Sequence, residues 1–117
     1  MNPTTERQRV FRVLNRDGDV FSCYADTICD VNGYGTFLRF KRDGEVVGET
    51  QGDIHGWWLD DGAVGKTWRL KIAGHDVEIV ADARKRTDEP RPCERFIRSG
   101  EIVAAVYTDY HTWTVDG

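Results

Sequence analysis

The sequence predicts an all-β protein, a single compact antiparallel meander barrel, and two features of the chain predict it. Short segments alternate apolar and polar residues, as strands with one buried face do. Turn-forming pairs separate these segments: Asp17-Gly18, Asn32-Gly33, Asp43-Gly44, Asp61-Gly62, Ala73-Gly74 and Ser99-Gly100. Glycine takes the positive φ of tight hairpin turns freely, and Asn or Asp tolerates it. A two-sheet β-sandwich is the alternative architecture.

The first half of the chain is expected to hold four strands, at residues 8–15, 20–31, 36–42 and 45–50. The second of these has the clearest alternation, with Phe21, Cys23, Ala25, Thr27, Cys29 and Val31 on one face. That face is predicted to lie on the core and the opposite, mostly polar face in water. In the fourth strand, Gly48 indicates a bulge or bend.

Residues 51–66 are rich in Gly and Asp, and the pattern does not decide between a short strand and a helical turn. Alternation returns in segments 67–73 and 76–83, where Trp68 is expected to face the core and Arg69 the solvent. Residues 84–93 are charged and hold two prolines, which predicts a mobile linker. A hairpin about Ser99-Gly100 joins residues 94–98 to 101–108, and a strand at 110–115 ends the chain. We recognise no internal repeat.

The chain has 117 residues, which fits one domain spanning residues 1–117, with residues 1–6 loose. Its formal charge of −4 disfavours a nucleic-acid backbone as the main partner, because such binders usually carry a clustered basic surplus, so we expect no nucleic-acid partner. No apolar run is long enough to span a membrane, and the N-terminus lacks an apolar leader. We therefore expect a cytoplasmic protein of unknown oligomeric state.

Three cysteines are an odd number and are expected to be reduced. On one extended strand, Cys23 and Cys29 would lie about 20 Å apart, at about 3.3 Å per residue, too far for a disulfide. Both are interpreted as buried small hydrophobes, whereas Cys93, between Pro92 and Glu94, is interpreted as an exposed thiol.

The segment 36–70 contains Phe37-Leu38-Arg39-Phe40-Lys41-Arg42-Asp43-Gly44-Glu45-Val46-Val47, then Trp58 and Gly65-Lys66-Thr67-Trp68. It resembles small bacterial lipocalin-like (calycin) β-barrel proteins over about a third of the chain. The Gly-x-Trp signature near the first strand of true lipocalins is missing. The resemblance implies a fold and not a ligand.

No reaction can be assigned from motifs. The three histidines, at positions 55, 75 and 111, show no metal-ligand spacing, and no nucleophile motif is present, so we expect no metal, no cofactor and no catalytic residue. Small residues on the predicted inner faces, such as Ala81 and Ala105, leave room in a barrel of about eight strands for a small ligand. Large aromatic side chains crossing the lumen would fill the same room.

The favoured hypothesis is a non-catalytic binding protein that holds a small, partly apolar ligand at a barrel mouth. The candidate lining residues are aromatic or lie beside aromatic residues: Trp57, Trp58, Trp68, Tyr107, His111 and Trp113. The alternative is a small acidic inhibitor of the immunity or anti-defence type, which blocks a partner protein through an exposed β-surface. An enzyme comes third, because no acid-base pair can be named.

Overall fold

The computed structural model describes residues 9–107 and 111–116, and every element in them is a strand, which confirms the all-β prediction. Predictions that fall on residues 1–8, 108–110 and 117 lie outside the described residues. The strands are β1 (Val10–Asn15), β2 (Val20–Tyr24), β3 (Thr27–Asp30), β4 (Phe37–Arg42), β5 (Glu45–Gln51), β6 (Ile54–Asp60), β7 (Thr67–Ile72), β8 (His75–Val80), β9 (Ala83–Thr87), β10 (Cys93–Arg98), β11 (Glu101–Val106) and β12 (His111–Asp116).

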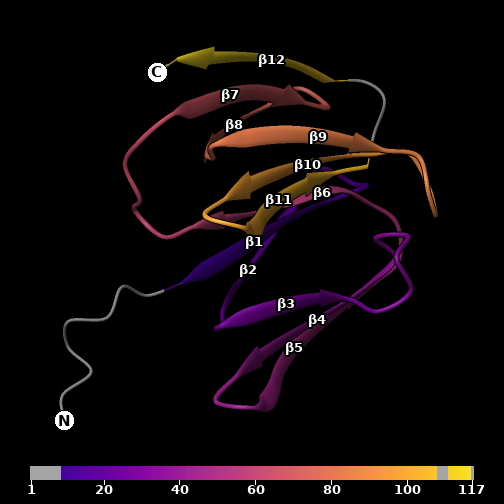
Figure 1. The fold of residues 1–117 in the computed structure, drawn as a ribbon. Helices are drawn as coiled ribbons and strands as arrows, with labels where there is room; N and C mark the ends of the chain where they lie inside the picture. Colours follow the sequence, from indigo (N-terminus) through magenta and orange to yellow (C-terminus); the bar gives the residue numbers. More distant parts are fainter. Residues whose placement is uncertain (1–8, 108–110, 117) are drawn as a thin grey trace, which may run out of the picture.

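The described strands form three antiparallel sheets and not a closed barrel, so packed sheets, the alternative architecture, describe the protein better. A central sheet has the order β2-β1-β6-β11-β10-β9, and two smaller sheets have the orders β12-β7-β8 and β3-β4-β5. The small sheets lie on either side of the central one (Figure 1). Phe40 of β4 packs on Phe11 of β1, while Trp68 of β7 packs on Phe96 of β10.

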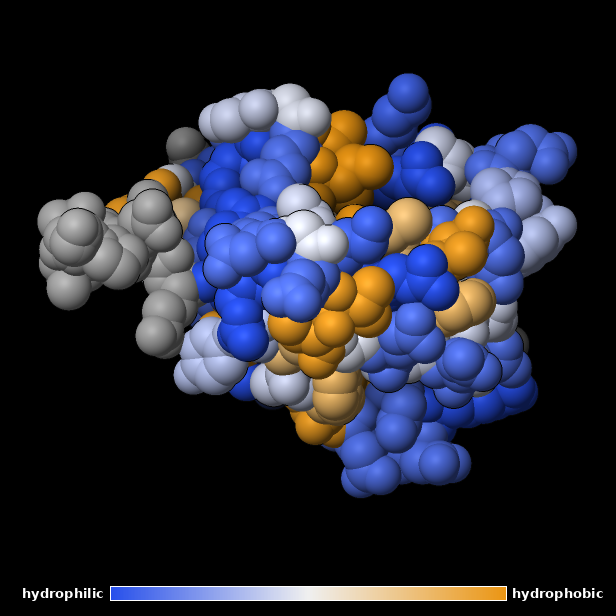
Figure 2. Space-filling model, turned by 90° about the horizontal axis from the view of Figure 1, so that it is seen from below, coloured by the Kyte–Doolittle hydropathy of each residue, from blue (hydrophilic) through white to orange (hydrophobic). Residues whose placement is uncertain are grey.

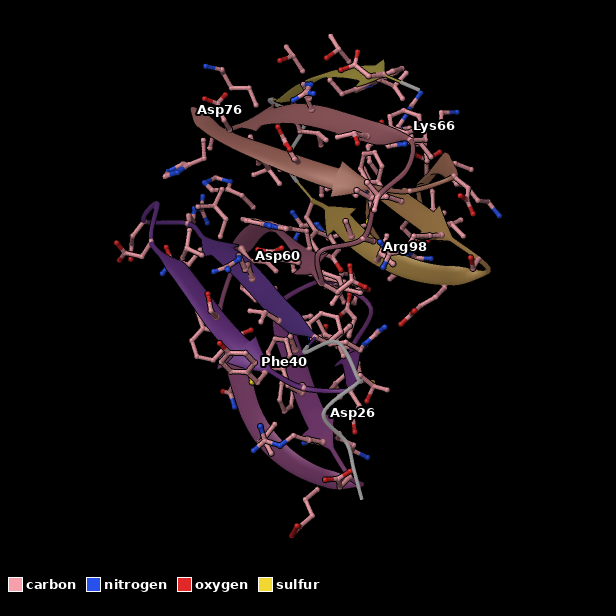
Figure 3. The ribbon with its side chains drawn as sticks, turned by 90° about the vertical axis from the view of Figure 1, so that its left-hand side faces the viewer. Asp26, Phe40, Asp60, Lys66, Asp76 and Arg98 are labelled. Atoms are coloured by element: carbon pink, nitrogen blue, oxygen red, sulfur yellow. The ribbon has the colours of Figure 1, made fainter. Side chains whose placement is uncertain are left out.

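The predicted strand 20–31 is two strands, because the chain bends at Ala25-Asp26 and passes from one sheet to another. The Ala25 N–H donates to the carbonyl oxygen of Arg9, the residue before β1. The N–H of the next residue, Asp26, donates to Lys41 O in β4. The Asp26 carboxylate accepts the N–H of Asp43 at 2.8 Å, which fixes the corner. Asp26 is labelled in Figure 3. The bend reverses which alternate residues face the core, and a period-two pattern cannot reveal that reversal.

The same bend corrects the cysteine predictions. All three thiols are free, as expected, but Cys29 is exposed, whereas Cys23 is buried. Cys93 is also buried and not exposed, because it begins β10 and faces the interior. Burial raises the pKa of the Cys23 and Cys93 thiols.

Two further segments differ from the prediction. The undecided residues 51–66 contain β6, which lies between β1 and β11 and buries most of its residues, so no alternation is visible. The first part of the predicted linker, residues 84–87, is also ordered as a strand, because Ala83–Thr87 forms the edge strand β9. The Arg84 guanidinium pairs with the buried Glu94 carboxylate at 2.6 Å, which explains a charged strand.

The chain contains an internal repeat that the sequence analysis missed. The six strands β1–β6, residues 10–60, have the same pairings as the six strands β7–β12, residues 67–116. Between Gly18 and Asp60, residue i of this first repeat corresponds to residue i + 56 of the second repeat. Matching residues include Ala25-Asp26 and Ala81-Asp82, Arg39-Phe40 and Arg95-Phe96, Gly44-Glu45 and Gly100-Glu101, and Asp53-x-His55-x-Trp57 and Asp109-x-His111-x-Trp113.

Contacts repeat as well as residues. The corner hydrogen bond of Asp26 recurs at Asp82, which accepts the N–H of Ser99 at 2.8 Å. The Arg12–Asp60 ion pair, at 3.0 Å, recurs as Arg69–Asp116 at 2.9 Å. The aromatic cluster Phe11, Phe40 and Trp57 recurs as Trp68, Phe96 and Trp113. The two halves are therefore copies of one six-strand unit.

The repeats are joined by β6 of the first and β11 of the second, which pair with Trp57 opposite Ala105. The approach is close at Gly56, where a Cβ would lie 2.8 Å from the carbonyl oxygen of Ala105. Only glycine fits this position without displacing backbone.

We expect one fast thiol in the native protein. Cys29 should react rapidly with a disulfide reagent, and Cys23 and Cys93 slowly, because burial suppresses their thiolates. Native and denatured thiol titration would measure this, and Cys29→Ser should remove the fast phase alone. A fast phase that survives Cys29→Ser would contradict the strand assignment.

Trp68 and Arg69 test which residues of β7 face the core. Trp68 is buried and its indole N–H donates to Ala81 O at 3.0 Å, so Trp68→Ala should cost about 3 to 5 kcal/mol. Arg69 is exposed, so Arg69→Ala should lower the stability far less than Trp68→Ala does, despite the ion pairs of Arg69. Chemical denaturation would compare them, and equal midpoints would contradict the assignment.

Candidate functional site

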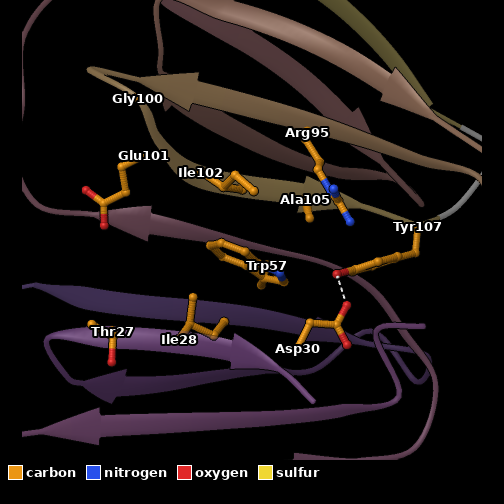
Figure 4. Close-up of a pocket in the computed structure, with 10 residues that line it drawn as sticks. All are labelled: Thr27, Ile28, Asp30, Trp57, Arg95, Gly100, Glu101, Ile102, Ala105 and Tyr107. Atoms are coloured by element: carbon orange, nitrogen blue, oxygen red, sulfur yellow. Dashed lines mark hydrogen bonds between the residues drawn. The ribbon is translucent and has the colours of Figure 1, made fainter. Parts of the chain in front are cut away.

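A groove of about 400 Å³ lies where the two repeats meet, between the free edge of β3 and the central sheet. Its lining residues come from β3, β6, β10, β11 and the flanking loops: Thr27, Ile28, Asp30, Trp57, Arg95, Gly100, Glu101, Ile102, Ala105 and Tyr107. The centre is apolar, with Trp57 between Ile28 and Ala105, while Arg95 and Tyr107 stand at one end and Glu101 at the other (Figure 4).

One end of the groove is closed by a hydrogen bond between the repeats. The Tyr107 hydroxyl donates to Asp30 Oδ2 at 2.7 Å. The same carboxylate accepts the backbone N–H groups of Gly33 and Gly35 at 3.0 to 3.1 Å. Since these donors occupy both oxygens of Asp30, its role is to hold the loop after β3 against the second repeat.

Tyr107 is fixed from several sides. The Arg91 guanidinium lies 5.4 Å from its ring centre and donates to its carbonyl oxygen at 3.0 Å. A Cβ on Gly35 would lie 2.8 Å from the ring, so glycine is required there. Burial, and then the hydrogen bond to Asp30, raise the pKa of Tyr107 far above its ordinary value.

The Trp57 indole N–H faces the groove region without a satisfactory acceptor. It is buried and has no hydrogen-bond partner of good geometry among the described residues. The indole N–H lies near the Tyr107 hydroxyl and lowers the pKa of Tyr107, which opposes the larger rise caused by burial. A buried donor without a partner of good geometry costs free energy.

Arg95 differs from its counterpart in the first repeat. Arg39 lies opposite Glu49 in the sheet and pairs with it at 2.9 Å. Arg95 lies opposite Ala105, which stands where the first repeat has Glu49, and Arg95 has no ion pair among the described residues. The second repeat therefore has the guanidinium without the carboxylate.

A second replacement adds positive charge at the same place. On its other side, Arg95 lies opposite Lys85, whereas Arg39 lies opposite Cys29. Like charges directly opposite each other in a sheet destabilise it. The other charged side chains of the groove are satisfied, because Glu101 pairs with Arg9 and Asp30 holds its three donors. Arg95, at the basic end of the groove, therefore lacks a carboxylate partner among the described residues, and its guanidinium lies beside the Cys93 thiol.

The six predicted site residues do not form one site. Trp57 and Tyr107 meet in the groove. Trp68 and Trp113 lie together in the second repeat, with ring centres 5.2 Å apart. Trp58 points to the opposite face of the central sheet from Trp57, and the side chain of His111 lies outside the described residues.

The sequence analysis missed Arg95, Ile28 and Asp30. Ile28 and Asp30 were assigned to the solvent face of a continuous strand, which the bend at Asp26 reverses. Arg95 was hidden among many charged residues. The signal that finds it is the internal repeat, because comparison of the two copies exposes the change from Glu49 to Ala105.

A larger, shallower hollow of about 640 Å³ lies on the outer face of β7, β8 and β12. The charged side chains that line it are paired: Arg69 with Glu78, and Lys71 with Asp76. Each charged side chain among the described residues that line this hollow has a partner, so the groove is the better candidate.

Among the described residues, no group of three or more His, Cys, Asp or Glu side chains is placed to hold a metal ion. The same part of the chain contains no helix of the length and apolarity needed to cross a membrane. Comparison with protein-family models, with curated proteins and with solved structures finds no match.

Tyr107→Phe tests the closure of the groove. Removing a hydrogen bond to a charged group should cost about 1.5 to 3 kcal/mol near neutral pH. Because the folded state keeps the phenol protonated, the unfolded state loses its proton first as the pH rises above about 10. Wild-type stability should therefore fall in that range, through this tyrosine, and the fall should be smaller in Tyr107→Phe.

Denaturation at several pH values would measure both effects. An unchanged stability at neutral pH, or identical alkaline profiles of the two proteins, would contradict the role assigned to Tyr107.

Proposed function

We propose that this protein is a non-catalytic binding protein, and that its ligand is a small molecule with a flat apolar part and an anionic group. The observation that carries the proposal is Arg95, whose counterpart Arg39 has a carboxylate partner that the second repeat replaces with Ala105. A ligand carboxylate would take the place of that missing side chain.

The groove supports both parts of such a ligand. Its volume of about 400 Å³ is in the range of small-molecule sites, which starts near 300 Å³. The Trp57 ring and the side chains of Ile28 and Ile102 offer apolar contact. A guanidinium binds a carboxylate through two parallel hydrogen bonds, which fixes orientation, and Lys85 adds attraction.

A second candidate function is binding to a partner protein. Trp113 and Val115 are exposed on β12, which favours contact through that β-surface. The cytoplasm remains the proposed compartment, in keeping with three free cysteines. The resemblance to lipocalin-like proteins also remains a proposal, and binding in a groove between sheets does not require it.

Binding of two fluorescent probes tests the proposal. Anilinonaphthalene sulfonate has a flat apolar part and an anionic group, whereas N-phenylnaphthylamine is similar in shape and uncharged. We expect saturable binding of the anionic probe, weakened about tenfold or more in Arg95→Ala, because one charge-assisted contact of about 1.5 kcal/mol or more is lost. The uncharged probe should respond much less.

Two variants make the test specific. Arg39→Ala removes the equivalent arginine of the first repeat and should leave the affinity unchanged. Ala105→Glu gives Arg95 the partner that Arg39 already has, so it should abolish binding of the anionic probe in a folded protein. Equal effects of Arg39→Ala and Arg95→Ala, or full binding by Ala105→Glu, would contradict the proposal.

A further inference from the structure

The β6–β11 pairing that joins the two repeats has no equivalent for the corresponding strands, β12 and β5. Each of these two strands therefore has a free edge. β6 is paired along its outer edge by β11, but its equivalent β12 is an edge strand. Likewise β11 is paired by β6, but its equivalent β5 is an edge strand. Among the described residues, neither free edge is covered by another strand.

We propose that these two edges bind each other between copies of this chain, so that β12 of one molecule adds to β5 of the next. The contact would repeat the β6–β11 pairing. Its register follows from the internal one, in which Ala104, Ala105 and Val106 lie opposite Trp58, Trp57 and Gly56. The equivalent pairs between molecules are Gly48 with Thr114, Glu49 with Trp113, and Thr50 with Thr112.

Exposed apolar side chains on both edges support this pairing. Val47 on β5 is 37% exposed, whereas its counterpart Val103 is 1% exposed. Trp113 on β12 is 38% exposed, whereas its counterpart Trp57 is 5% exposed. Val115 is exposed and its counterpart Leu59 is buried. The face over β3, β4 and β5 is mostly hydrophilic, with separate hydrophobic clusters (Figure 2).

The backbone of both edges is also suited to pairing. The Tyr107 N–H donates to His55 O across the β6–β11 junction. In an antiparallel pair, every second residue points its N–H and C=O groups to the same neighbouring strand. Ala105 and Trp57, each two residues away, therefore also point these groups across the junction. By equivalence, Glu49 and Trp113 point theirs outward from the free edges. Unpaired groups of this kind are a template for strand addition.

Side-chain differences make the contact between molecules weaker than the internal one. The internal Ala105, Val106 and Trp58 correspond to Glu49, Thr50 and Thr114, which bury less apolar surface. The glycine requirement at position 56 accompanies a bulge in β6, whereas β12 pairs with β7 in unbroken register. The Cβ of Thr112 cannot approach a carbonyl oxygen as closely as Gly56 approaches that of Ala105, so the strands must lie farther apart there. We therefore expect weak, concentration-dependent association.

The contact uses two different surfaces, so it is head-to-tail. After two molecules pair, one β5 edge and one β12 edge remain free at the ends. Such an arrangement grows into a filament or closes into a ring, depending on the rotation between neighbours. A symmetric dimer would instead use the same edge of both molecules.

Single-edge variants distinguish these cases. Glu49→Pro removes the outward N–H of β5 and leaves the β12 edge intact, and Val115→Pro does the reverse. Val47→Lys is a second β5 variant that keeps every backbone group. Circular dichroism would verify that each variant is folded, and sedimentation velocity over a wide concentration range would measure association.

We expect wild-type protein to associate as its concentration rises and each single-edge variant to stay monomeric. An equal mixture of Glu49→Pro or Val47→Lys with Val115→Pro should form a one-to-one dimer and nothing larger, because only one pair of edges is intact. Wild-type protein that stays monomeric at every concentration would overturn the proposal. A second result would also overturn it. If only the β5 variants or only the β12 variant lost association, and the mixture formed no one-to-one dimer, the contact would be symmetric.

Discussion

The structure depends on the pairing of β6 with β11. This contact joins the two six-strand repeats into one central sheet, and it is so close at Gly56 that a side chain would meet the carbonyl oxygen of Ala105. It also places Trp57 of the first repeat next to Ala105 and Arg95 of the second, in one row across the sheet. The groove exists because the repeats meet here, and the hydrogen bond from Tyr107 to Asp30 closes one end of it.

The two copies of the unit are alike in their interior and different where they meet. The aromatic clusters, the Ala-Asp corners and the Arg–Asp ion pairs recur, and the corners turn the chain of each copy from one sheet to another. The outer face of β4 and β5 carries the Arg39–Glu49 pair, whereas the corresponding face of β10 and β11 carries Arg95 beside Ala105 and Lys85. This difference gives the second repeat a basic site that the first repeat lacks. The same junction leaves β5 and β12 unpaired.

Local patterns predicted most strands, because the turns at Asp43-Gly44, Ala73-Gly74 and Ser99-Gly100 take positive φ, which glycine adopts freely. Trp68 also lies in the core, as its alternation predicts. The bend at Asp26 was missed because it is fixed by contacts with β1 and β4, which are distant in sequence. β6 was missed because a strand buried on both faces does not alternate. Trp57 and Tyr107 were named from their aromatic character, but Arg95 could be found only by comparing the repeats.

The central claim is that the second repeat uses Arg95 as a vacant ion-pair position in the groove. Nuclear magnetic resonance of the side-chain N–H groups tests it directly, with naphthoate as a flat aromatic carboxylate. On titration, the Arg95 Nε–H and the Trp57 indole N–H should shift together and saturate, and the Nε–H of Arg39, which already has Glu49, should stay in place. Equal shifts of Arg39 and Arg95, or no shift at Arg95 while Trp57 responds, would contradict the account.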